Sequence, residues 1–222
     1  MKNVTKKLLA ALCAAAVMTS FASCSDEKTE SEAETSGTGA LVDKNGDPEF
    51  VTDTDEPDMG EYTISEKGTK LYYDPEAVSP ELMEALEGYF VAYSQNDYEA
   101  YTEWIYPEYI TEMTKYLEKD FGYDMKTSFS SQYESLKTNA GGEFTVTRIK
   151  AELPEESGLD EYFATLDEIF GIDFYESVKA DADELHDLIF YVIAEAEGEE
   201  TLLISEFEIV FAEKDGRYYT FG

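Results

Sequence analysis

Few residues in this chain belong to the types that most often carry catalysis or bind metals. It has one histidine, His186 in "DELHDL", and two cysteines, Cys13 and Cys24. A histidine can act as a general base, but no catalytic partner accompanies this one, and Glu184 and Asp187 flank it. We therefore expect a solvated or capping histidine. One histidine and no cysteine after residue 24 exclude the commonest zinc sites, so we expect no metal site and no cofactor.

Carboxylates and tyrosines are the other candidates for acid–base chemistry. The chain has 50 Asp+Glu and 17 Tyr, so such pairs arise by chance, and no spacing singles out a base with its donor. We assign no catalytic residue. The aromatic side chains after residue 88 could line a pocket for a small apolar ligand, and the candidates are Tyr93, Tyr101 and Trp104. Aromatic residues at helical spacing more often belong to a packed core.

Cys24 lies where an apolar run ends and an acidic segment begins. Lysines at positions 2, 6 and 7 precede the run "LLAALCAAAVM", which is too short to span a bilayer and is typical of a secretion signal. The following "FASC", residues 21–24, resembles the lipobox of bacterial lipoproteins, although Phe21 stands where that pattern usually has leucine. The resemblance implies that Cys24 is acylated and becomes the new N-terminus, which anchors the protein to a membrane. The alternative is an ordinary signal peptide cut after Ala22.

Composition limits the partners and the domain organisation. The formal net charge of -34 repels phosphate backbones, so we expect no nucleic acid partner. Residues 24–60 are polar and acidic and predict a disordered tether, which leaves residues 61–222 for one globular domain. Within the tether, "DKNGD" resembles a calcium loop, but its glycine comes fourth rather than sixth and no glutamate closes the loop. A turn there is the better interpretation.

Helix signals dominate the first half of this domain. Ser79 and Pro80 predict a helix start, and apolar residues then recur on one face. A break at residues 95–97 predicts a second helix that continues to Pro107, and a third helix is expected over residues 108–118.

A short hairpin or an extended lead-in is expected at residues 62–73, before these helices. Strand signals dominate the second half of the domain. The alternation over residues 144–153 changes face near Thr147 and predicts a bulged strand, and a helix is expected over residues 159–170. Two apolar runs from Leu188 and Thr201 predict an antiparallel hairpin with a turn at residues 198–200, and a last strand follows Asp215-Gly216. Helices followed by a hairpin-rich sheet indicate an α+β fold with N-terminal helices packed on a curved antiparallel sheet.

Two segments resemble a known superfamily. "YFVAYSQNDYEAYTEWIYPEYI" and "EIVFAEKDGRYYTFG" are similar to the helical opening and final strands of the cone-shaped nuclear-transport-factor-like superfamily, which includes ketosteroid isomerases and many small bacterial lipoprotein domains. The likeness covers roughly residues 80–222, and in this chain Arg217 and Tyr218 replace the usual Lys-Trp of the last turn. The resemblance implies a curved sheet around helices, with a pocket at the open end.

These observations lead to one expected function and two alternatives. We expect a lipoprotein on the extracytoplasmic face of a cell membrane, with a non-catalytic domain that binds a cell-envelope protein or a small apolar ligand. One alternative is a small isomerase or dehydratase that uses a carboxylate and a tyrosine in the pocket. The other is a calcium-dependent adhesion module.

Overall fold

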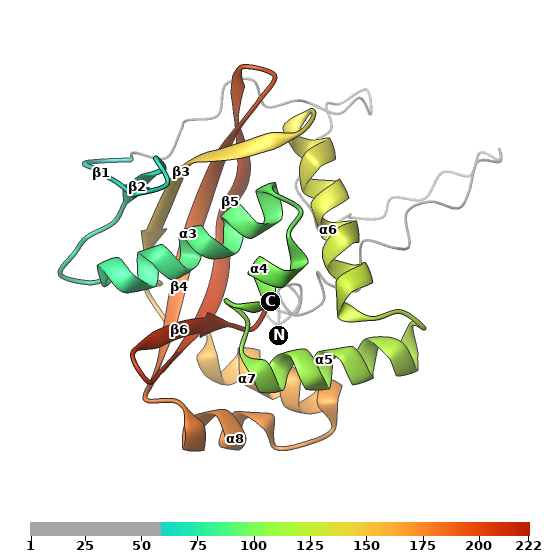
Figure 1. The fold of residues 1–222 in the computed structure, drawn as a ribbon. Helices are drawn as coiled ribbons and strands as arrows, with labels where there is room; N and C mark the ends of the chain where they lie inside the picture. Colours follow the sequence, from blue (N-terminus) through green and yellow to red (C-terminus); the bar gives the residue numbers. More distant parts are fainter. Residues whose placement is uncertain (1–58) are drawn as a thin grey trace, which may run out of the picture.

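Residues 59–222 are the part of the chain that the computed structural model describes, and they form an α+β fold (Figure 1). Its helices are α3 (Pro80–Ser94), α4 (Tyr98–Thr102), α5 (Pro107–Asp120), α6 (Met125–Ala140), α7 (Leu159–Phe170) and α8 (Phe174–Asp181). Its strands are β1 (Thr63–Ile64), β2 (Lys70–Tyr72), β3 (Phe144–Glu152), β4 (Glu184–Ala196), β5 (Glu199–Lys214) and β6 (Arg217–Thr220). The predicted α+β class is confirmed. The predicted signal peptide and nearly all of the tether lie outside the described residues.

The strands of this part form one curled sheet in the order of the sequence, β1 to β6. Figure 1 shows α3 crossing one face of the sheet, with α5, α7 and α8 gathered at one end. The prediction of an antiparallel sheet is wrong at one pair, because β2 and β3 run parallel. The chain between these two strands passes through four helices, and so long a crossover can return a strand in either direction.

Bulges set the register of the long strands. The predicted bulge at Thr147 is confirmed, since the β3–β4 pairing shifts between Val146 and Arg148. The β4–β5 pairing shifts twice more, between Phe190 and Ile193. Both strands are also longer than expected, because their polar ends continue the ladder beyond the apolar runs.

Capping residues explain where the helices begin. The Ser79 side chain accepts a hydrogen bond from Leu82 N–H at 3.1 Å, as predicted for the start of α3. The second helix is shorter than expected and ends at Thr102. Its predicted continuation is replaced by sheet contacts, since Ile105 bridges to Thr220 and Tyr106 N–H donates to the Thr220 carbonyl at 2.9 Å.

Two helices, α6 and α8, were not predicted from the sequence. Helix α6 has a mostly polar sequence with few buried residues, so its apolar periodicity is weak. Its ends are nevertheless well defined, because the Asp124 carboxylate caps Thr127 N–H at 2.8 Å and Gly141 adopts a left-handed φ of 84°.

The β4–β5 turn differs from its prediction and yields a test. Its two central residues are Glu197 and Gly198, with φ of 54° and 88°, which is the pattern of a type I′ hairpin turn. Glutamate is strained at a positive φ, whereas asparagine tolerates it. We expect Glu197→Asn to stabilise the protein by about 0.5–1 kcal/mol in urea unfolding. A Glu195→Asn variant in the neighbouring strand serves as the control, and an equal gain there would contradict this explanation.

Candidate functional site

The predicted ligand-binding residues do not form one site. Tyr93 and Tyr101 are buried in the core, 2% and 3% exposed, with ring centroids 5.2 Å apart. Phe129 of α6 packs against both rings at 4.8 Å. Trp104 lies against Gly88 of α3 instead, and the ring contacts of the described residues do not join it to either tyrosine. Tyr93 and Tyr101 are therefore core residues, as the competing interpretation of their spacing held.

Five phenols come together in this core. We call Tyr89, Tyr93, Tyr101, Tyr109 and Tyr162 the tyrosine cluster. Burial raises the pKa of Tyr89 to about 12 and the pKa values of the other four well above their usual range. Tyr162 is only partly buried as a residue, but its hydroxyl points inward and donates to the Phe221 carbonyl at 3.4 Å. These phenols stay neutral at physiological pH and act as hydrogen-bonding core groups.

The acidic residues that accept hydrogen bonds from tyrosine hydroxyls are exposed in the part of the chain that the structure describes. One of these hydrogen bonds joins the Tyr106 hydroxyl to Asp181 Oδ2 at 2.5 Å, and Lys214 Nζ also contacts that oxygen at 2.5 Å. The Lys214 ammonium and then the Tyr106 hydroxyl lower the pKa of the Asp181 carboxyl. A general base needs a raised pKa to accept protons near neutral pH. Asp181 is therefore suited to an ion pair with Lys214 rather than to proton transfer with Tyr106.

The buried carboxylates of the described residues have structural partners. Glu87 of α3, 2% exposed, accepts from the Ser65 hydroxyl at 2.6 Å and lies 3.7 Å from Lys67 Nζ. Asp187 of β4, 6% exposed, accepts from Gly158 N–H at 2.7 Å and from the Ser157 hydroxyl at 3.2 Å. Gly158 is the N-cap of α7 and has no capping side chain, so Asp187 takes that role from the sheet.

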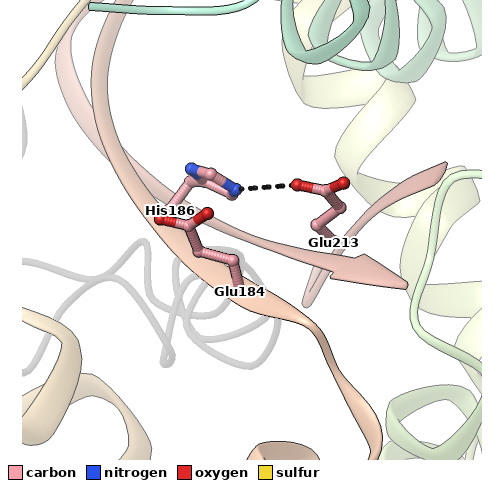
Figure 2. A group of neighbouring side chains, drawn as sticks. All are labelled: Glu184, His186 and Glu213. Carbon is pink, nitrogen blue, oxygen red and sulfur yellow. Dashed lines mark ion pairs between the residues drawn. The ribbon is translucent and has the colours of Figure 1, made fainter. Parts of the chain in front are cut away.

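The side chains best suited to bind a ligand lie together at the start of β4 and near the end of β5. Glu184 and His186 are two residues apart on β4 and share one face, and Glu213 of β5 is directly opposite Glu184 (Figure 2). His186 Nε2 lies 3.6 Å from Glu213 Oε2, and the three ligand atoms lie within 4.8 Å of one another. We call these residues the His186 triad. His186 belongs to a strand and caps no helix, and its side chain is 23% exposed, so the expected histidine is only partly solvated.

Neighbouring side chains hold the His186 ring in place. The ring of Tyr218 on β6 meets it edge to face, with centroids 5.4 Å apart. The Tyr218 hydroxyl accepts from the Ser79 hydroxyl at 3.2 Å, which connects the triad to the start of α3. Burial and the Glu213 carboxylate raise the pKa of Tyr218, so this hydroxyl remains protonated. The triad therefore has an ordered polar surrounding.

The sequence pointed to His186 and its neighbour Glu184 without predicting a site there, and it gave no reason to single out Glu213. Glu184 and His186 stood out together, but Glu213 is one of many acids in a strand far along the chain. Its place opposite Glu184 depends on the register of the β4–β5 hairpin, which no local signal in the sequence shows. Cys24 lies outside the described residues, so its predicted lipidation stays a prediction.

Comparison with protein-family models, with curated proteins and with solved structures finds no match to this chain. Its function must therefore be argued from its own residues.

Proposed function

We propose that this protein is a lipoprotein, anchored by acylated Cys24 to the extracytoplasmic face of a cell membrane. The observation that carries the proposal is the order of features before residue 25: lysines, a short apolar run, two small residues and a cysteine. Two acyl chains on one residue suffice for stable anchoring. Among the helices of residues 59–222, none has the length and apolar character needed to cross a bilayer.

The folded domain, on this proposal, binds a cell-envelope partner and does not catalyse a reaction. Its curled sheet with helices supports a cone-like fold of the nuclear-transport-factor-like type. The rings of Tyr93 and Tyr101 contact each other and Phe129, which favours a partner at the surface over a small apolar ligand between these rings. The high negative charge would attract a partner with a cationic surface.

The anchor is tested by expressing the full chain in a bacterial host and measuring intact mass and partitioning into detergent. We expect the wild-type protein to begin at Cys24, to carry a lipid-sized mass increment and to enter the detergent phase. Cys24→Ser will lose both properties because the acylated sulfur is gone. Cys13→Ser is the matched control, since it changes the other cysteine and should leave the anchor intact.

A different result would contradict the proposal. If the wild-type mature chain carries no lipid and stays in the aqueous phase, the protein is a diffusible secreted domain. If Cys24→Ser enters the detergent phase as the wild type does, acylation of Cys24 does not hold the protein at the membrane, and the lipid-anchor proposal is wrong.

A further inference from the structure

The His186 triad has the composition and spacing of a metal site. Tetrahedral zinc with bonds of about 2.0–2.1 Å places its ligand atoms about 3.3 Å apart. The 3.6 Å between His186 Nε2 and Glu213 Oε2 is close to that separation and is too long for a hydrogen bond. One ring nitrogen of His186 and one carboxylate oxygen each of Glu184 and Glu213 lie within 4.8 Å of one another, so small side-chain rotations bring all three residues to one ion. The spacing fits an ion between the groups better than direct bonding among them.

His186 Nε2 is a second, independent indication. This nitrogen is closed to solvent, and none of the residues from 59 to 222 forms a hydrogen bond with it. A buried polar nitrogen that makes no hydrogen bond is costly, because its 3.6 Å contact with Glu213 does not replace the water that it has lost. A metal ion bound at Nε2 would satisfy it, and Figure 2 shows this nitrogen directed toward Glu213.

Charge repulsion between two members of the triad is a third indication of a bound cation. Glu184 and Glu213 are directly opposite on neighbouring strands, and like charges in that relation destabilise a sheet. A divalent cation between them would turn this repulsion into attraction. The net charge of -34 also raises the local concentration of cations near the protein.

We propose that Glu184, His186 and Glu213 bind one divalent first-row transition ion of the Zn²⁺ type. An imidazole nitrogen with two carboxylates suits zinc and its neighbours, whereas calcium and magnesium prefer oxygen ligands alone. Three protein ligands leave a fourth position for water, and the exposure of Glu184 keeps that position open to solvent. The ion would link the start of β4 to the end of β5, at the end of the hairpin that is far from its turn. This inference does not rest on the lipid anchor.

The single histidine makes a specific test possible. We would titrate Zn²⁺ into the purified full chain in excess Mg²⁺, which occupies weak carboxylate sites, and follow the imidazole resonances by NMR. Because His186 is the only histidine, these signals report the triad and not the two cysteines. We expect the resonances to shift and to saturate at one equivalent of Zn²⁺.

Variants separate the triad from general attraction to acids. Glu184→Gln and Glu213→Gln should each weaken Zn²⁺ binding at least about tenfold, and His186→Gln should remove this binding event from calorimetric titrations. Glu195→Gln is the matched control, because Glu195 is exposed and faces Glu200 across the same hairpin without a histidine. It should leave the affinity unchanged. Glu184 is exposed, so its replacement tests the site even if the Glu213 variant folds poorly.

Three outcomes would overturn the proposal. One is a shift that never saturates, and another is the same shift with Mg²⁺ alone. The third is equal weakening by Glu195→Gln and Glu184→Gln, which would show an adventitious effect of total charge.

Discussion

Above about pH 10, this protein will unfold in one steep transition, because its tyrosine cluster can ionise only in the unfolded chain. Burial raises the pKa of Tyr89 to about 12 and raises those of Tyr93, Tyr101, Tyr109 and Tyr162 well above their usual range. In the unfolded chain the same phenols lose their protons near pH 10. Their contribution to stability is thus fully present below that pH and is lost as the pH rises toward the folded values.

The effect is large because five residues act together. Each phenol that is neutral in the folded state and ionised in the unfolded state lowers the free energy of unfolding by about 1.4 kcal/mol per pH unit. Five such groups give a slope of about 7 kcal/mol per pH unit, and a domain of this size is stable by only about 5–15 kcal/mol. The cluster alone is enough to unfold the protein within about two pH units.

Phenolate absorbance and circular dichroism, recorded during the same pH titration, check this prediction. We expect much of the phenolate signal to appear together with the loss of secondary structure. Tyr89→Phe will lower the number of protons released on unfolding by about one, which makes the transition shallower. Tyr62→Phe is the control, because Tyr62 is 49% exposed, and it should leave the slope unchanged. Gradual ionisation of all tyrosines in a folded chain would contradict the burial of the cluster.

Local signals in the sequence predicted many elements correctly, and the reason is that these elements depend on near neighbours. Ser79 with Pro80 marked the start of α3, and the Asp215-Gly216 pair marked the last hairpin. The residues of α7 were predicted over the range that the structure has. Helix caps and tight turns depend on the residues within a few positions of them, so one sequence is enough to predict them.

The His186 triad could not be predicted because it depends on two irregular steps in the β4–β5 ladder. Near the turn Ala196 faces Glu199, and a regular ladder from there would place Phe211 opposite Glu184. The two register shifts move the partner of Glu184 to Glu213. One residue at these shifts, Glu206, has a positive φ of 51°. Such bulges follow from packing across the whole sheet, and the strand pattern alone does not show where they fall.

Replacing Gly88 should be the most damaging small substitution in α3. Gly88 is helical, so any residue fits its backbone conformation. A Cβ there would lie 2.7 Å from the Trp104 indole nitrogen and closer still to two of its ring carbons. The indole is rigid and cannot bend away, so it must leave its place on the helix. Glycine is present because the ring occupies the space of a side chain.

We expect Gly88→Val to destabilise the protein by about 3 kcal/mol, since it combines overpacking with the loss of the Trp104 contacts. Trp104 is the only tryptophan, so its fluorescence reports this displacement directly and should shift to the red as the ring meets water. The effect should be smaller for Gly88→Ala, because alanine recovers up to about 1 kcal/mol in helix propensity.

A double-mutant cycle distinguishes a clash with the indole from a general intolerance of the helix. In a Trp104→Leu background the flexible, smaller side chain leaves room for a Cβ, so Gly88→Ala should become neutral or stabilising. The coupling between the two positions is then the cost of the contact itself. If Gly88→Ala stabilises the wild-type background as well, helix propensity is decisive and the indole does not rest on Gly88. The sign of one measured change in the free energy of unfolding therefore decides whether Trp104 is part of the packed core.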